Sequence, residues 1–404
     1  MQSRRTKFIF LAVLALFVFF FSSDFGLIDV EKTAIITAIA IDKDNDLYEV
    51  TAQIAVPEAT DTNSENLKTQ ITAKDTTIGG AIKNLGDYSG WFPKLAFCNL
   101  ILLGDSLLED NVIDVLDYFA KSLRVQDSAL VALADGKAGE LISKATPLDN
   151  ISAFALQKIM LKNVGFDADI ASTDIKTFCV GHYSLNSSAL MPIVKVIKSS
   201  ENQTDTGGGG SSGAGSGTSS SGGGSSSKED KNNLFDARTT ALFVKGKKVG
   251  ELSPELTQTY SALYKTFEGT SFSVNDVDFK GQKTNYLLSV VDCRPKIKLH
   301  ATENDLRLSI TLKLYCKISD HSADGSSEAL SQNNPIPEKV KEKAEQYFTD
   351  NINELLRTEK QTGCDFMQIK QKLYRYNHKQ YSRYKDNYLS VLKTDVNVSV
   401  FGQK

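Results

Sequence analysis

The chain has 404 residues, of which 41% are hydrophobic and 24% are charged, and its formal net charge is −3. This composition is typical of a globular protein, and the length is sufficient for two or three hydrophobic cores. The nearly balanced charge argues against a protein whose surface as a whole binds nucleic acid.

The N-terminal residues form a hydrophobic segment preceded by positive charge. Three cations among the first seven residues precede a 14-residue apolar run, Phe8 to Phe21, which has the length of a signal-peptide core. Extended to Ile28, the segment has 21 residues and one charge, Asp24, and it could then cross about 30 Å of hydrocarbon. We interpret residues 1–28 as a signal or anchor segment. An uncleaved anchor, with the N-terminus in the cytoplasm and the bulk of the chain outside, is favoured over a cleaved signal peptide.

Residues 29–185 alternate between strand and helix patterns, which predicts one α/β domain. Strands at 34–41 and 48–56 are expected to pair across the turn Asp42–Asp46. The remaining predicted elements are helices at 77–85 and 108–123, strands at 99–103 and 128–134, and helical segments near Ala138 and Ile151.

The acidic turn has the D-x-D-x-D spacing of a calcium loop. However, Leu47 stands where that loop needs glycine, and Gln53 stands where it needs a bidentate glutamate. A solvated hairpin turn is the favoured interpretation.

Residues 186–288 are predicted to form a small middle domain. It contains strands at 189–197, 239–244 and 248–252, and a helix that begins at Ser253-Pro254. Residues 199–233 interrupt it with ten glycines and eleven serines. Such a segment cannot bury enough apolar surface to offset its ordering entropy, which predicts a disordered insert at a hairpin tip.

Residues 289–404 are predicted to form a C-terminal α+β domain. Strands are expected near 286–291, 296–301 and 306–314, followed by a long helix from Pro337 to Gly363 and a final strand at 396–400. The predicted fold class is therefore α+β, with three mixed α/β domains, each a central sheet flanked by helices, and an N-terminal hydrophobic anchor.

The candidate site is a basic, tyrosine-rich segment, residues 370–385, with six cations and no acidic residue. One interpretation is contact with an anionic membrane surface or an acidic partner. The other is a solvated helical face whose tyrosines pack inward. The candidate contact residues are Lys370, Lys372, Arg375, Tyr376, Lys379 and Arg383.

No catalytic, cofactor or metal site is predicted. The four histidines are far apart, and no P-loop or dinucleotide fingerprint is present. Five cysteines are scattered without a C-x-x-C pair. Cys98 is expected to be a buried small hydrophobe, and a Cys293–Cys316 disulfide is left open.

Several segments, taken in order, resemble the Ger(x)C family, the C subunits of spore nutrient-germinant receptors. Each segment is weak alone, and their order and spacing carry the resemblance. They are Ala34–Asp42, Tyr48–Pro57, Thr76–Leu85, Asn99–Gly104, Asp114–Phe119, Ala241–Gly250, Gly363–Phe366 and Val396–Gly402.

The resemblance implies a non-enzymatic receptor subunit in the spore inner membrane, with its domains on the outer face. It also implies assembly with integral-membrane A-type and B-type subunits. No cofactor is expected. Members of the family typically begin with a lipid-anchor cysteine, but that position is Asp24 here. The hydrophobic segment would therefore replace the lipid anchor.

An exported solute-binding protein is the alternative from a different class. That function requires a deep cleft between domains and direct binding of a small molecule.

Overall fold

The computed structural model describes residues 12–14, 33–55, 70–122, 125–144, 146, 151–161, 169–198, 233–264, 267–279, 282–322 and 335–402. The predicted anchor lies outside these ranges except for Ala12–Leu14, which are helical, and the predicted insert lies outside them except for Asn233. Within the described ranges, no helix has the length and apolar character needed to cross a bilayer.

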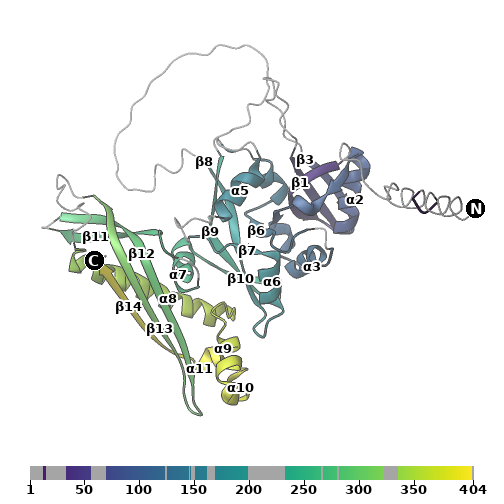
Figure 1. Ribbon diagram of the computed structural model, residues 1–404. Helices are drawn as coiled ribbons and strands as arrows, with labels where there is room; N and C mark the ends of the chain where they lie inside the picture. Colours follow the sequence, from purple (N-terminus) through teal and green to yellow (C-terminus); the bar gives the residue numbers. More distant parts are fainter. Residues whose placement is uncertain are drawn as a thin grey trace, which may run out of the picture.

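Among the described residues there are two sheets, and the first has ten strands in the order β10-β9-β8-β6-β5-β1-β2-β3, with β4 paired to β1 and β7 paired to β6 (Figure 1). Its centre is parallel, because β1, β5, β6 and β8 run in one direction. The strands are β1 (Thr33–Asp44), β2 (Leu47–Ala55), β3 (Gln70–Asp75), β4 (Phe92–Lys94), β5 (Leu100–Leu103), β6 (Leu130–Ala134), β7 (Thr173–Asp174), β8 (Ser188–Lys198), β9 (Asn233–Val244) and β10 (Lys247–Leu252).

Helices cover both faces of this sheet, so its central strands are apolar on both sides. In β1, Ile39 and Ile41 face a core shared with α2 (Ile78–Ser89), α3 (Val112–Ser122) and α6 (Ile175–His182). The alternate residues Ala38 and Ala40 face a second core with α4 (Ala138–Ile142) and α5 (Ser152–Met160). The 3-10 helices η2 (Leu95–Phe97) and η3 (Asp105–Leu107) lie in the connections.

The second sheet has four strands in the order β11-β12-β13-β14, and α8 packs against it (Figure 1). The strands are β11 (Ser271–Phe279), β12 (Gln282–Ala301), β13 (Leu306–His321) and β14 (Lys393–Gly402). The helices in this half are α7 (Pro254–Tyr264), α8 (Glu338–Thr362), α9 (Ile369–Tyr376), α10 (His378–Tyr384) and α11 (Tyr388–Val391).

The expected mixed α/β fold class is confirmed, with a large central sheet, a second sheet and flanking helices. The predicted helix that ends at Gly363 is confirmed, and this glycine is left-handed with φ 68°. The two strands expected near 286–291 and 296–301 are instead one strand, β12. Pro295 keeps its register opposite Leu312, so no break occurs there.

The strands on the two sides of the predicted domain boundary at residue 185 belong to one sheet. β8 pairs with β6 of the preceding segment, and β9 and β10 extend the sheet from β8. The division into residues 29–185, 186–288 and 289–404 remains a prediction.

All five cysteines are free. Cys98 is fully buried, as expected, and burial raises the pKa of its thiol to about 12. Cys293 and Cys316 form no disulfide, and they are not opposite each other, since Cys293 pairs with Leu314 and Cys316 with Val290.

The interpretation of Asp42 as part of a solvated turn is wrong. The turn is at Asn45 and Asp46, while Asp42 lies in β1 and is only 5% exposed. Its carboxylate accepts hydrogen bonds from the backbone N–H groups of Ala138 (2.9 Å) and Gly139 (2.8 Å). Asp42 therefore caps the first turn of α4 from across the sheet.

Replacement of Asp42 by Ala should lower the free energy of unfolding by about 2 kcal/mol, because two backbone donors lose their acceptor. Urea unfolding measures this loss. Asp46→Ala is the matched control, since Asp46 is exposed in the same hairpin. Equal stability of the two variants would contradict the capping role.

Candidate functional site

The two sheets meet along a seam that is apolar in its centre. Leu242 of β9 and Leu252 of β10 belong to the same core as the second sheet, together with Leu263 of α7. On the other side of the seam are the end of α8 and the segment Cys364–Leu373. This seam holds the two sheets together and positions α9.

Asp365 is the polar centre of the seam and is fully buried. Its backbone N–H donates to Ser188 Oγ (3.0 Å), and its carbonyl accepts from Asn186 Nδ2 (2.7 Å). Ser188 is the first residue of β8. These two bonds therefore tie the C-terminal segment to the large sheet.

The carboxylate of Asp365 points the other way and holds α9. Oδ1 accepts from the N–H of Ile369 (2.6 Å), and Oδ2 accepts from the N–H of Lys370 (2.8 Å) and the hydroxyl of Tyr388 (3.1 Å). A carboxylate at a helix N-terminus satisfies free N–H groups and interacts favourably with the helix dipole.

Glu359, in the last turn of α8, is buried beside Asp365. Its Oε1 accepts from the N–H of Met367 (2.9 Å). Burial raises the pKa of Glu359 well above its ordinary value, and the charge of Asp365 raises it further. The neutral form of Glu359 therefore suits this site.

Lys372 belongs to the seam rather than to the surface. Its Nζ donates to the carbonyl of Met367 and to Tyr264 Oη (3.2 Å), and it lies 5.0 Å from the centre of the Tyr264 ring. Burial lowers the pKa of Lys372. Lys370 is also half-buried, with its Nζ 5.9 Å from the centre of the Tyr388 ring.

The other four predicted contact residues are exposed on α9 and α10. We call Arg375, Tyr376, Lys379 and Arg383 the basic surface; Tyr376 is 76% exposed. In the same segment Tyr384 is buried and its hydroxyl donates to the carbonyl of Thr302 (2.8 Å). The segment thus has a packed side and an exposed basic side, and a contact role for the exposed side remains a prediction.

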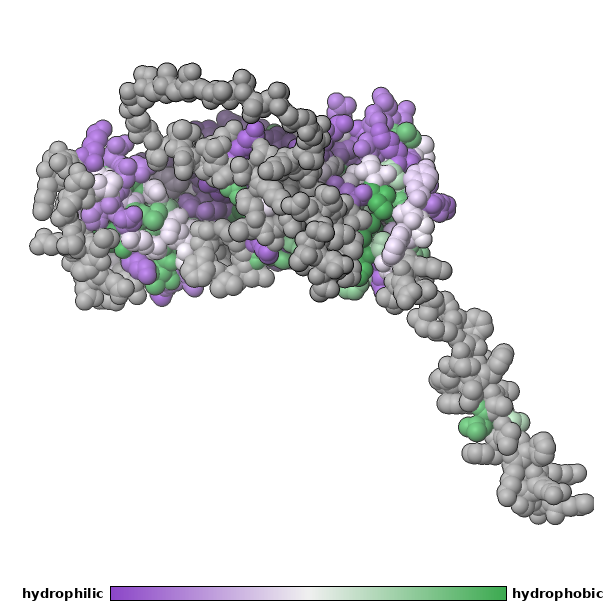
Figure 2. Space-filling view, turned by 90° about the horizontal axis from the view of Figure 1, so that it is seen from above, coloured by the Kyte–Doolittle hydropathy of each residue, from purple (hydrophilic) through white to green (hydrophobic). Residues whose placement is uncertain are grey.

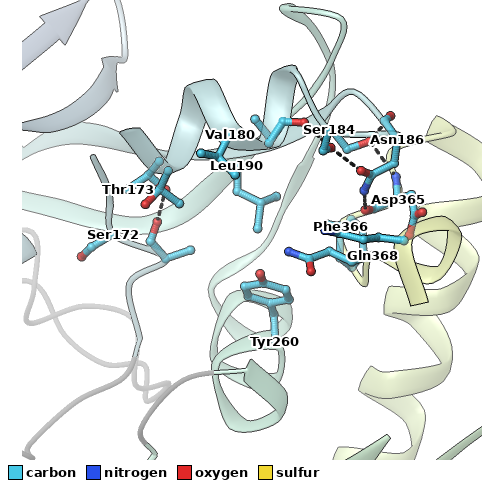
Figure 3. Close-up of a pocket in the computed structure, with 16 residues that line it drawn as sticks. Ser172, Thr173, Val180, Ser184, Asn186, Leu190, Tyr260, Asp365, Phe366 and Gln368 are labelled. Carbon is cyan, nitrogen blue, oxygen red and sulfur yellow. Dashed lines mark hydrogen bonds between the residues drawn. The ribbon is translucent and has the colours of Figure 1, made fainter. Parts of the chain in front are cut away.

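A cavity of about 160 Å³ lies at the seam (Figure 3). Its volume is below the roughly 300–1,000 Å³ typical of drug-sized ligand sites. Tyr260, Phe366 and Leu190 supply apolar walls, and Asn186, Ser184 and Gln368 supply polar groups. Sequence reasoning missed this cavity, because its lining comes from segments between residues 171 and 371.

Two family models match the chain in order. The model described as "Spore germination protein N-terminal domain" matches residues 27–196, and the one described as "Spore germination B3/ GerAC like, C-terminal" matches residues 238–401. Together they cover more than half of the sequence. The chain therefore belongs to the Ger(x)C family of spore germination proteins, as its segments indicated.

Among solved structures, the chain is similar to one titled "Crystal Structure of the GerBC protein". The identity is 17% and the TM-score 0.48, and the match covers 93% of this chain and 100% of that one. None of the curated proteins matches the chain.

Replacement of Glu359 by Gln should make stability less dependent on pH. A carboxyl group with a raised pKa in the fold stabilises it below the ordinary pKa, 4.5 here, and this contribution is lost as pH rises towards the raised value. Gln does not titrate, so the wild type should lose stability relative to Glu359→Gln between about pH 5 and about pH 8.

Urea unfolding at both pH values measures this difference. Glu342→Gln, at an exposed position of the same helix, is the matched control and should follow the wild type. The same pH slope in the wild type and in Glu359→Gln would contradict a buried neutral carboxyl group.

Proposed function

We propose that the chain is the C-type subunit of a spore nutrient-germinant receptor. It is a non-enzymatic protein, anchored in the spore inner membrane by its N-terminal segment, with both sheets on the outer face. It assembles with integral-membrane A-type and B-type subunits. The observation that supports this proposal is the ordered pair of family matches, over residues 27–196 and 238–401.

The proposal is tested with a tagged full-length chain expressed in spores. The chain should sediment with the inner membrane, and two integral-membrane proteins should co-purify with it in detergent. Deletion of its gene should abolish germination on the nutrient that the receptor detects and leave germination by a nutrient-independent trigger intact. A chain found in the spore core, or normal nutrient germination after deletion, would refute the proposal.

The basic surface is the proposed contact with a partner subunit. Within the described part of the chain, Arg375, Lys379 and Arg383 form no ion pairs with acidic side chains. They lie on short helices that the seam holds in a fixed position. Opposite charge on a partner would favour association and set its orientation.

Reversal of Arg375, Lys379 and Arg383 to Glu should therefore reduce co-purification of the membrane subunits and slow nutrient germination. Lys372 is left out, because its contacts with Tyr264 and Met367 make its reversal a test of stability. The matched control reverses three exposed lysines on the second sheet, Lys296, Lys298 and Lys313. If both triple variants behave alike, the basic surface has no specific role.

The second candidate is an exported solute-binding protein, whose ligand would occupy the small cavity at the seam. Tyr260, Phe366 and Leu190 form apolar walls and Gln368 adds a polar group, while the side chains of Ser184 and Asn186 are hydrogen-bonded to each other at one side of the cavity. Calorimetric titration of the full-length chain with amino acids and sugars should show micromolar binding if this function is correct. The receptor-subunit proposal expects no binding heat from the isolated chain.

A further inference from the structure

Four aromatic side chains are exposed within a single ten-residue segment, 88–97. Tyr88 is 71% exposed, Trp91 48%, Phe92 45% and Phe97 50%. We call these four residues the aromatic patch. Single exposed aromatic residues are common on proteins, whereas four large ones within one short segment favour an interaction surface.

The exposure of the patch is not the result of a poorly packed segment. Leu85, Leu95 and Cys98 around it are buried in the core on the inner side. Gly90, with φ 72°, ends α2 and turns the chain into β4. The segment therefore supplies buried apolar residues to the core, and its four aromatic rings are exposed in addition to these.

The patch lies where the chain enters the folded part from its N-terminal segment. Strand β4 pairs in parallel with the beginning of β1, so that Phe92 is opposite Thr33 and Lys94 is opposite Ile35. Between Phe21 and Thr33 the chain can span at most about 40 Å, and from Ile28 less than about 20 Å. The patch is thus tethered close to any bilayer that holds the hydrophobic segment.

The composition of the patch suits the interface of a bilayer. Tryptophan and tyrosine are enriched at the level of the headgroups, where their rings contact both apolar and polar groups. Lys94 lies beside the patch, with Nζ 5.9 Å from the centre of the Phe97 ring, and its amine can reach lipid phosphate while its stem stays apolar. Figure 2 shows hydrophobic and near-neutral residues next to hydrophilic ones at the end of the molecule where α2 lies.

We propose that the aromatic patch inserts into the outer-leaflet interface of the bilayer that holds the N-terminal segment. This inference rests on the membrane anchoring in the proposed function, and it adds an orientation. With the patch against lipid, the end of the molecule that carries α2 faces the membrane. The basic surface on α9 and α10 lies at a different end, below the seam in Figure 1, and is left for a protein partner.

Trp91 is the only tryptophan of the chain, so its fluorescence reports on the patch alone. The full-length chain is reconstituted in vesicles of phosphatidylcholine and phosphatidylglycerol, with or without brominated acyl chains. We expect Trp91 emission to lose most of its intensity with brominated lipid and to be protected from iodide in the water. Tyr88→Ser with Phe97→Ser should weaken both effects.

The matched control moves the probe to the basic surface, in the double variant Trp91→Phe with Tyr376→Trp. This tryptophan should be quenched by iodide and unaffected by brominated lipid. If the chain floats with the vesicles but Trp91 behaves like the control, the inference is overturned and the membrane part of the proposed function stands. A chain that does not float overturns both the inference and the membrane part of the proposed function.

Discussion

The hydrogen bonds of Asp365 are the constraint on which the arrangement of the two sheets depends. Its main chain is bound to Ser188, the first residue of β8, and to Asn186 in the turn before that strand, while its carboxylate holds the first turn of α9. Asp365 is buried beside Cys364, Phe366 and Met367, so loss of these hydrogen bonds would leave buried polar groups without partners. These bonds act together with the apolar core of the seam to fix the position of the basic surface relative to the large sheet.

Local patterns in the sequence were sufficient for most helices and strands. The pairing of β1 with β2 and the stop of α8 at Gly363 follow from short-range alternation and turn chemistry. Asp42 was misinterpreted, because its partner Ala138 is 96 residues away and nothing near Asp42 indicates a helix end. The two strands expected near 286–291 and 296–301 are one strand, because the pairing of β12 with β13 continues through Pro295.

The candidate site was predictable only in part, because here too the decisive contacts join residues that are far apart in the sequence. The basic segment was found from its charge, and four of its six named residues are exposed. The burial of Lys372 depends on Tyr264, 108 residues away, and could not be predicted from composition. The proximity of Glu359 to Asp365 was hardly predictable. The sequence indicates only that Asp365 lies between Cys364 and the apolar residues Phe366 and Met367.

The register of β8 and β9 has a practical consequence. Lys198 pairs directly with Asn233, so the ends of segment 199–232 are held opposite each other by the sheet. Closing a longer loop between fixed ends costs only about 0.6 kcal/mol per doubling of its length. The segment can therefore be shortened, or exchanged for a fluorescent domain, to follow the protein in living spores while both sheets stay intact.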